Sequence, residues 1–261
     1  MRSLSIAATG MLAQQTNVDV ISNNIANMNT TAFKRQRAEF QDLLYQQVAR
    51  PGAVAGGAEA RTPAGIQIGA GVKTGGVYRI AEQGALTKTD NRFDMALQGQ
   101  GYFQVLMPSG ETAYTRAGSF QLSPTGEIVT ADGLVVQPGI TLPADTQSVA
   151  INANGQVIAQ VAAQTAPVTV GQFELATFAN EAGLENTGNN LLRETAASGA
   201  PVTGVAGSTG FGSLQQGFLE TSNVNVVSEI TNLITAQRAY EMNSKVIQVS
   251  DEMSNSLNQL R

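Results

Sequence analysis

Cysteine, histidine and tryptophan are all absent from the 261 residues of this chain. The lack of cysteine excludes disulfides, thiolate nucleophiles and cysteine-based zinc sites. The lack of histidine removes the usual general base, the Ser-His-Asp triad and histidine metal ligands. Aromatic residues make up only 5% of the chain, which leaves little with which to enclose a sugar. Composition therefore argues against most hydrolases and metalloenzymes, and we expect no cofactor and no bound metal.

Charge is also scarce. Charged residues make up 13% of the chain, against roughly a quarter in ordinary soluble domains, and the net charge is −5. The densest basic run is only Lys34-Arg35-Gln36-Arg37. A nucleic-acid partner is not expected, because phosphate neutralisation needs a basic face. Sparse charge suits surfaces that are buried against other subunits.

Long hydrophobic runs are missing as well. No stretch reaches the roughly 20 apolar residues that cross a bilayer, although a hydrophobic content of 42% is enough for a real core in one large domain or two modest ones. The start does not resemble a cleaved secretion signal, because Arg2 is followed by a weakly apolar stretch, Leu4 to Ala13, that continues into glutamines. If the protein leaves the cytoplasm, we expect a route without cleavage.

The middle of the chain, from about Val77 to Phe218, alternates apolar and polar residues, which predicts β-strands. Turn signals such as Pro108-Ser109-Gly110 and Asn154-Gly155 separate them. We therefore predict antiparallel hairpins in a sandwich or open barrel, with no helix longer than about two turns. The strand candidates are Phe93–Leu97, Tyr102–Met107, Ser119–Leu122, Leu134–Val136, Val157–Gln160, Val168–Val170 and Phe173–Thr177.

A segment rich in glycine and proline, Arg50 to Gly76, precedes these strands. It could be a linker between two rigid parts. It could instead pack against a neighbouring surface, because Ile66, Ile68 and Val72 give it apolar side chains that can be buried there. A second Gly/Ser/Thr-rich stretch, Ala196 to Gly217, marks the return to the C-terminal end.

Both ends of the chain carry apolar heptad patterns that predict helices. The predicted seam of the first end is Leu4, Ala7, Met11, Gln14, Val18, Ile21, Ile25 and Met28. The predicted seam of the second end is Asn232, Thr235, Ala239, Met242, Val246, Val249, Met253, Ser256 and Leu260. A second apolar line repeats beside each seam, formed by Ile6, Ala13 and Val20 in the first helix and by Val226, Leu233, Tyr240 and Ile247 in the second.

Two apolar lines on each helix leave two interpretations open. Both helices could form the core of an ordinary monomeric bundle. Alternatively, because one partner helix would not cover both lines, the ends could become helical only when several copies pack together. Asn225 is the predicted N-cap of the second helix, and Glu229 is expected near the positive end of its dipole.

Motifs that carry catalytic chemistry are weak. Gly69-Ala70-Gly71 with Lys73-Thr74 fails the phosphate-loop pattern, because Val72 stands where a glycine must precede the lysine. A carboxylate pair for glycoside hydrolysis could come from Asp90, Asp94 and Glu111, but surface charge explains these residues better. We therefore expect no enzyme activity.

The motifs at the two ends resemble a known family. Ser22–Lys34 (SNNIANMNTTAFK) is similar to the N-terminal signature of the bacterial flagellar axial proteins, the family of rod and hook subunits. Its C-terminal counterparts are Leu219–Val227 (LETSNVNVV) and Ala236–Lys245 (AQRAYEMNSK). Further matching segments extend the resemblance to distal-rod subunits over essentially the whole chain: Gln36–Tyr45, Gly65–Val72 and Leu97–Phe103.

Two positions depart from the pattern of this family. Ser5 stands where tryptophan is frequent, and Ala32 where glycine is frequent. Neither position belongs to a predicted seam, so the resemblance holds.

The resemblance implies an α+β fold, in which discontinuous N- and C-terminal helices form a coiled-coil-like axial domain around an inserted antiparallel β-rich domain. The expected parts are an N-terminal axial helix with its connecting segment (1–45), a Gly/Pro-containing extended segment of the distal-rod type (46–76), a β-rich outer domain (77–218) and a C-terminal axial helix (219–261).

The function implied is that of a structural subunit of the flagellar distal rod. Copies would assemble into a helical tube that transmits motor torque to the hook as a rigid drive shaft and serves as a channel for exported subunits. The subunit would be exported without a cleaved signal and reside in the basal body, in the rod that crosses the periplasm to the outer membrane. The alternatives are a hook or proximal-rod subunit, or a secreted β-domain binding protein.

The expected partners are further copies of the chain, proximal-rod and hook subunits, the surrounding P- and L-ring proteins, and the flagellar type III export apparatus with the rod cap; no small-molecule substrate is expected. The predicted assembly interface is Leu4, Met11, Val18, Ile21, Asn23, Asn24, Ile25, Asn27, Met28, Ile230, Leu233, Tyr240, Met242, Val246, Ile247, Val249, Met253 and Leu260. The residues expected to distinguish a straight rod are Pro51, Pro63, Ile66, Ile68 and Val72.

Overall fold

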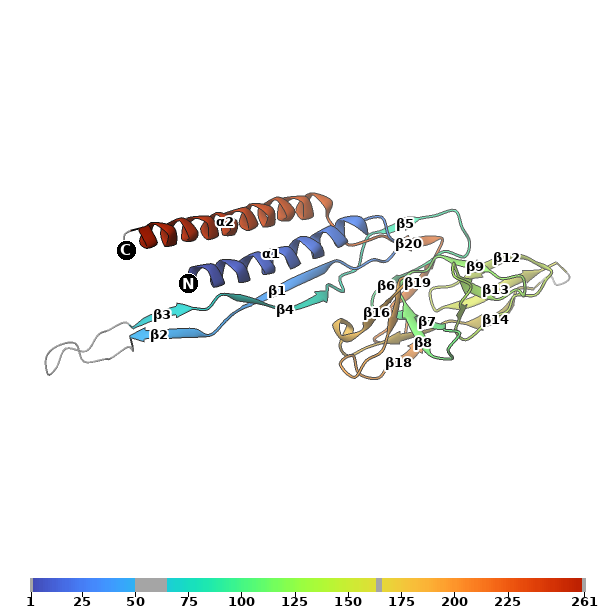
Figure 1. The fold of residues 1–261 in the computed structure, drawn as a ribbon. Helices are drawn as coiled ribbons and strands as arrows, with labels where there is room; N and C mark the ends of the chain where they lie inside the picture. The colour runs from blue at the N-terminus through green and yellow to red at the C-terminus, as the bar shows by residue number, and fades with distance from the viewer. Residues whose placement is uncertain (1, 50–64, 163–165, 260–261) are drawn as a thin grey trace. The chain divides into compact units, whose positions relative to one another are not determined.

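The computed structural model describes residues 2–49, 65–162 and 166–259, and these divide into two compact units (Figure 1). Unit 1 comprises Met1–Ala26, Gln36–Tyr78 and Asn225–Arg261, and unit 2 comprises Asn27–Arg35 and Arg79–Val224. Both ends of the chain therefore contribute to one unit, while the β-rich middle forms the other. The predicted α+β class, with discontinuous terminal helices and an inserted β-rich part, is confirmed.

Unit 1 is built on two long helices that lie side by side, α1 (Arg2–Ala26) and α2 (Val226–Gln259). Asn225 caps α2 as predicted, because its Oδ1 accepts a hydrogen bond of 3.2 Å from the backbone N–H of Ser228. Glu229 lies in the first turn, where the helix dipole favours a negative charge.

Four strands complete unit 1. β1 (Gln36–Asp42) pairs with β4 (Val72–Arg79), and β2 (Tyr45–Ala49) pairs antiparallel with β3 (Ile66–Gly69). The linker interpretation of the glycine-rich segment is therefore wrong for its described part, which forms strands. The sequence analysis names no strand candidate at 36–49. The strands there, β1 and β2, pair with strands that are distant in sequence, so no local turn signal indicates them.

The strand pairs described in unit 2 are all antiparallel. Its large sheet has the order β16-β17-β8-β7-β11-β10-β9, and β15 joins β7 to β18. A smaller sheet has the order β12-β13-β14, and two further pairs are β6 with β19 and β5 with β20. The bounds are β5 Leu86–Lys88, β6 Met95–Gln98, β7 Tyr102–Leu106, β8 Thr112–Thr115, β9 Phe120–Leu122, β10 Ile128–Thr130, β11 Val135–Val136, β12 Thr146–Ile151, β13 Gln156–Val161, β14 Val168–Gln172, β15 Glu174–Thr177, β16 Glu185–Gly188, β17 Leu191–Arg193, β18 Val202–Val205, β19 Ser213–Gln216 and β20 Phe218–Glu220.

Every strand candidate from the sequence overlaps an observed strand. Within the described residues of 77–218, the only helical segment is a single 3-10 turn, Glu181–Gly183, as predicted. The predicted turns at Gly110 and Gly155 are also present, with φ of 86° and 79°, which glycine adopts without steric cost. The second glycine-rich stretch, by contrast, contains β18 and β19, whose partners lie far away in sequence.

One main hydrophobic core connects the two larger sheets of unit 2. Phe103 of β7 makes edge-to-face contacts with Phe120 and Phe173, at centroid distances of 5.0 and 6.4 Å. Val149 and Val157 of the smaller sheet belong to the same cluster. Two sheets that share one core correspond to the sandwich alternative of the prediction.

Candidate assembly surface

The two helices of unit 1 meet along an antiparallel heptad seam. Ser3 Oγ lies 2.6 Å from Ser250 Oγ, and a Cβ added at Gly10 would lie 2.9 Å from Asn243 Nδ2. Further along, Asn24 Nδ2 donates to Glu229 Oε2 at 3.1 Å. Steps of seven residues up α1 thus match steps of seven residues down α2, which is the repeat of a coiled coil.

This seam differs from the predicted one. On α1 the contacts with α2 lie on the line of Ser3, Gly10 and Asn24 instead of the predicted line of Leu4, Met11, Val18 and Ile25, while Ala7 and Ile21 of the predicted seam are buried. On α2 the contacts with α1 lie on the line of Glu229, Asn243 and Ser250, to which the buried Ala236 also belongs, whereas Tyr240 of the predicted second line is 45% exposed. The correction has a steric cause, because small residues such as Gly10 let the helices approach closely, which larger residues at these positions would prevent.

Asn24 is the polar junction of unit 1. Its Nδ2 donates to the Gln36 carbonyl at 2.8 Å, and its Oδ1 accepts from the Gln36 N–H at 2.8 Å. Together with the Glu229 contact, these bonds tie α1, β1 and α2 together at a buried point. The prediction placed Asn24 in an interface between copies, whereas the structure gives its side chain a role inside the subunit.

The strands of unit 1 cover the second apolar line of α1. The backbone N–H of Val72 in β4 donates to Thr9 Oγ1 at 3.3 Å, and a Cβ at Gly71 would overlap the same oxygen. Thr9 shares its helix face with Ile6, Ala13 and Val20. Ala13 and Val20 are buried. The two apolar lines of α1 therefore do not both need a helix from another copy, because strands of the same chain pack against one of them.

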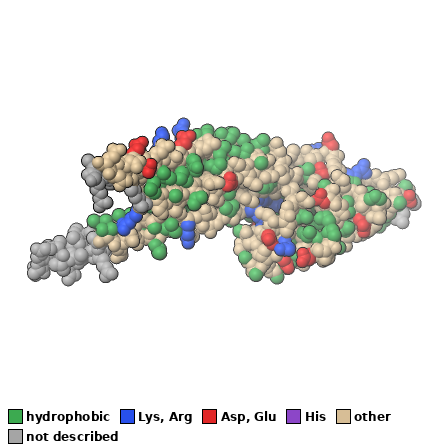
Figure 2. All heavy atoms as spheres, viewed as in Figure 1, with side chains coloured by type: hydrophobic (Ala, Val, Ile, Leu, Met, Phe, Trp, Pro, Cys, Tyr) green, Lys and Arg blue, Asp and Glu red, His purple; other side chains and the backbone are tan. Residues whose placement is uncertain are grey.

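The predicted seam of α2 is exposed in the single chain. Met242, Val246, Val249 and Met253, called the ridge below, have 47–62% of their surface accessible. A second exposed group lies at the start of α2, where Val227, Ile230 and Ile234 are 45–75% accessible. Hydrophobic side chains accordingly show on the surface of the two helices (Figure 2). Apolar contiguity of this kind marks interaction sites in soluble proteins.

The other predicted interface residues are distributed as follows. Asn23, Met28 and Tyr240 are exposed, Ile21 is buried, and the half-buried members are Leu4, Met11, Val18, Ile25, Asn27, Leu233 and Ile247. Leu260 lies outside the described residues, as do Pro51 and Pro63. Of the remaining straight-rod residues, Ile66 and Ile68 are exposed and Val72 is half-buried.

Residues of both end signatures also meet inside unit 2, in a group that sequence reasoning missed. The carboxylate of Glu220 accepts from Lys34 Nζ at 2.5 Å, from Arg116 Nε at 2.6 Å and from the Gly84 N–H at 2.9 Å. We call these residues the Glu220 network. The only hint in the sequence is that Lys34 and Glu220 each lie within a signature.

The electrostatics of the Glu220 network follow from burial and proximity. Burial alone would raise the pKa of Glu220, but the charges of Arg116 and Lys34 outweigh it and hold that pKa below its ordinary value. Burial lowers the pKa of Lys34. Arg116 is further held by the carbonyls of Gly101 and Gly99, at 2.9 and 2.6 Å. The network thus has paired charges, with carbonyl acceptors for the remaining donors.

The network anchors Asn27–Arg35, which we call the strap, to the rest of unit 2. The Ala32 N–H donates to the Glu220 carbonyl at 2.8 Å, and the Arg35 N–H donates to Asn223 Oδ1 at 2.7 Å. Asn223 Nδ2 in turn donates to the carbonyls of Ile80 and Glu82. Residues of both end signatures therefore form stabilising bonds inside unit 2 as well as in the helices.

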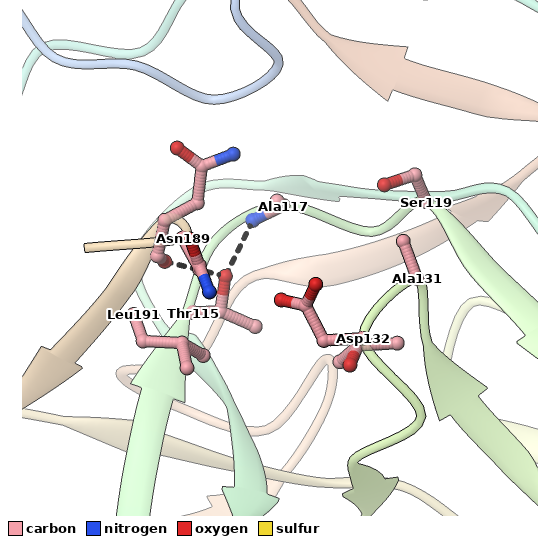
Figure 3. Close-up of a pocket in the computed structure, with 9 residues that line it drawn as sticks. Thr115, Ala117, Ser119, Ala131, Asp132, Asn189 and Leu191 are labelled. Atoms are coloured by element: carbon pink, nitrogen blue, oxygen red, sulfur yellow. Dashed lines mark hydrogen bonds between the residues drawn. The ribbon is translucent and has the colours of Figure 1, made fainter. Parts of the chain in front are cut away.

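A polar pocket of about 220 Å³ in unit 2 offers little for catalysis (Figure 3). Thr115 Oγ1 donates to the Asn190 carbonyl at 2.8 Å and accepts from the Ala117 N–H at 3.1 Å, and Asp132 is the one carboxylate among the lining residues. The candidate acids have other partners: Asp94 accepts from Asn91 at 2.8 Å, and Glu111 lies 4.0 Å from Arg193. Among the described residues, no group of three metal-binding side chains occurs, and no helix is long and apolar enough to span a membrane.

The chain therefore belongs to a class of proteins in which helices from the two chain ends pair with each other and a β-rich unit is inserted between them. Three family models match the chain: "Flagella basal body rod protein" over residues 4–34, "Flagellar hook protein FlgE/F/G D1 domain" over 96–159, and "Flagellar basal body rod FlgEFG protein C-terminal" over 215–260.

Relatives named "Flagellar basal-body rod protein FlgG" match the chain over nearly all of its length. That of Caulobacter vibrioides is 58% identical over 100% of both chains, and that of Agrobacterium fabrum is 52% identical over 97% of both. That of Bacillus subtilis is 42% identical over 100% of this chain and 99% of its own. The chain belongs to the FlgG family of flagellar basal-body rod proteins.

Proposed function

We propose that this chain is a structural subunit of the bacterial flagellar distal rod and has no enzyme activity. Copies assemble into a helical tube that transmits motor torque to the hook and gives passage to exported subunits. The observation that carries the proposal is the full-length match to rod proteins at up to 58% identity.

The exposed apolar residues of α2 support this role. The ridge has no cover within the described part of its own chain, and its burial between copies would gain about 1.5–3 kcal/mol for each fully buried side chain. A contact between two different surfaces of identical subunits does not close on itself unless its rotation closes a ring, so it generates a helical polymer.

Resistance to shear is the second requirement of a drive shaft. A sliding of one helix past another would break several knob-into-hole contacts at once, and the buried bonds of Asn24 would be lost with them. The proposed site of action is the rod of the basal body, crossing the periplasm, reached by export without a cleaved signal. The partners proposed are proximal-rod and hook subunits, P- and L-ring proteins, the export apparatus and the rod cap.

Complementation tests the assignment. Expression of this chain in a Caulobacter strain that lacks its own FlgG should restore rods and swimming, whereas expression in a strain that lacks the hook subunit should not. Rescue of the hook-less strain alone would favour the hook alternative. A soluble monomer that binds a sugar or peptide, and rescues neither strain, would favour the secreted binding protein.

Val246→Asp tests the role of the helices in polymerisation. Because Val246 is about half exposed, its charge should leave monomer stability within about 0.5 kcal/mol and still block polymer growth. Ile25→Asp should also block growth, but with a loss of stability, because Ile25 is half-buried. Gln237→Asp, on an exposed position of the same helix, is the control. Normal polymers from both Val246→Asp and Ile25→Asp would contradict the proposed interface.

A further inference from the structure

The last part of unit 2 along the chain, residues 213–223, bonds to several other parts of this unit. β19 pairs antiparallel with β6, and β20 pairs antiparallel with β5 (Figure 1). The Gln216 side chain accepts a hydrogen bond from the Ile151 N–H at 2.9 Å and donates to the Val149 carbonyl at 3.0 Å, both in β12. The same segment holds the strap through the hydrogen bonds described above. We call residues 213–223 the latch.

The latch is joined to its partners over the longest sequence separations among the described strand pairs of unit 2. Gln215 Nε2 donates to Gln98 Oε1 at 2.8 Å, across 117 residues of sequence. The other described pairs join closer residues, for example Leu175 with Phe103 in β15 and β7. Because the entropic cost of closing a loop rises with its length, pairs with shorter loops form more readily. Leu214 is the one latch residue in the main hydrophobic core, so that core can assemble before the latch docks.

The rest of unit 2 presents three hydrogen-bond donors to the latch. Lys34 Nζ, Arg116 Nε and the Gly84 N–H all donate to the carboxylate of Glu220. The side chains of Lys34 and Arg116 are each only 8% exposed. Two positive charges that converge in a buried place repel each other, so their approach is unfavourable until a carboxylate lies between them. The three donors therefore form a receptor for a carboxylate.

Gly84 also makes room for the backbone of the latch. A Cβ at this position would lie 1.9 Å from the Thr221 carbonyl oxygen. The Thr221 N–H donates to the Ala85 carbonyl at 2.9 Å, so the two backbones are held at this distance. Gly84 has no positive φ, and the close approach alone therefore accounts for the glycine. The receptor fits the latch in shape as well as in charge.

We propose that the latch docks last when unit 2 folds, and that the Glu220 carboxylate closes the receptor formed by Lys34, Arg116 and Gly84. Because a chain is synthesised from its N-terminus, both cationic residues are made long before Glu220, and unit 2 of an unfinished chain stays open. In the finished chain the latch is the part of unit 2 that opens first. The latch concerns the folding of a single chain, so it does not depend on the proposed role in the rod.

Hydrogen exchange of the full chain, followed by mass spectrometry of its peptides, tests the order of opening. In the wild type, the amides of β19 and β20 should exchange before those of β13 in the core. Glu220→Gln should speed exchange in β19 and β20 about a hundredfold or more and leave β13 unchanged, because opening the latch no longer breaks buried ion pairs. Glu185→Gln, which removes an exposed carboxylate, should change neither. Exchange of β19, β20 and β13 together in the wild type would overturn the proposal.

Gly84→Ala tests the fit of the backbone without a change of charge. The added Cβ should separate the latch from its receptor and speed exchange in β19 and β20, again with β13 unchanged. Gly76→Ala is the matched control, because a Cβ there meets nothing within 4 Å. Latch amides that exchange at the wild-type rate in Gly84→Ala would contradict the close docking.

Glu220→Ala tests the receptor itself, because it leaves space for a small carboxylate beside Lys34 and Arg116. Sodium formate should raise the urea midpoint of this variant more than sodium chloride at the same concentration, since the formate ion binds only the folded receptor. In Glu185→Ala the two salts should act alike. A Glu220→Ala chain that folds in formate and not in chloride would support the receptor equally. The same response to both salts in Glu220→Ala would overturn it.

Discussion

At the scale of single residues, Ala32 occupies a backbone conformation that suits glycine. Its φ is +57°, in the left-handed region where a Cβ is strained. The family resemblance places glycine at this position frequently, and the structure supplies the physical reason. Ala32 also donates its N–H to the Glu220 carbonyl, and this hydrogen bond to a strand of unit 2 holds the conformation.

Ala32→Gly should stabilise the folded chain. Relief of left-handed strain gains about 1–2 kcal/mol and the added freedom of the unfolded chain costs about 0.4–1 kcal/mol, so a net gain of about 0.5–1 kcal/mol is expected. Urea unfolding followed by the near-UV circular dichroism of tyrosine measures it. Ala85→Gly, at an exposed position of unit 2 without positive φ, should instead destabilise. Equal losses from both substitutions would contradict the strain at Ala32.

The Glu220 network makes a second prediction at this scale. Glu220→Gln leaves the charges of Lys34 and Arg116 buried without a counter-charge, and the expected loss of stability is about 3–5 kcal/mol. Glu185→Gln, which removes a carboxylate from the exposed ion pair with Arg193, should change little. A similar effect from both substitutions would show that the network contributes no more than a surface pair.

The stability of the chain in acid should also depend on the carboxylate of Glu220. Because the folded pKa of Glu220 is below its unfolded value, its stabilisation is fully present above the unfolded pKa of about 4.3 and is lost as pH falls through the folded pKa. Wild-type stability should therefore fall in acid more steeply than that of Glu220→Gln, as measured by urea midpoints from pH 6 down to about 3. Parallel curves would contradict this account of Glu220.

At the scale of elements, the register of the helix pair is the feature that can be tested most directly. Ser3 and Ser250 have hydroxyl oxygens 2.6 Å apart, so their Cβ atoms are close enough for a disulfide. Ser3→Cys/Ser250→Cys should form a disulfide within one chain, which migrates faster than the reduced monomer on a gel. Ser3→Cys/Ser244→Cys, about 9 Å away along the helix, should not. A disulfide in the second variant alone would show a different register.

The strand pairs of unit 1 explain why α1 is better covered than α2. One face of α1 packs on α2, and another lies against β4 at Thr9. In α2, only Glu229, Ala236 and Ser250 are fully buried among the described residues. The unpartnered surface therefore lies mainly on the C-terminal helix.

At the scale of the whole molecule, unit 2 has its own hydrophobic core and its own buried ion network. A chain reduced to residues 27–224 should therefore keep cooperative unfolding and the near-UV signal of its buried tyrosines. It should not polymerise, because both helices are gone. A chain reduced to 36–224 also loses the strap with Lys34 and should be markedly less stable, which urea unfolding measures. Loss of all tertiary signal from 27–224 would show that unit 2 depends on the helices.

Much of this architecture was predictable from local patterns. The heptads at both ends, the cap at Asn225 and the alternating strands of the middle depend on residues within one or two turns of each other, which a linear pattern records. Glycines such as Gly110 mark turns for an equally local reason. The strands from Gln36 to Arg79 were not predictable, because their partners lie far away in sequence.

The sequence by itself determined that the two ends are helical, that the middle is β-rich, and that catalysis based on cysteine or histidine is excluded. Only the tertiary structure decided which line of each helix forms the seam. Two apolar lines of equal period lie on each end, yet the close approach at Gly10 and the bonds of Asn24 place the contact on a neighbouring line of small and polar residues. The Glu220 network was likewise decided by the fold, because its three charges are distant in sequence and become a site only when burial forces them to pair.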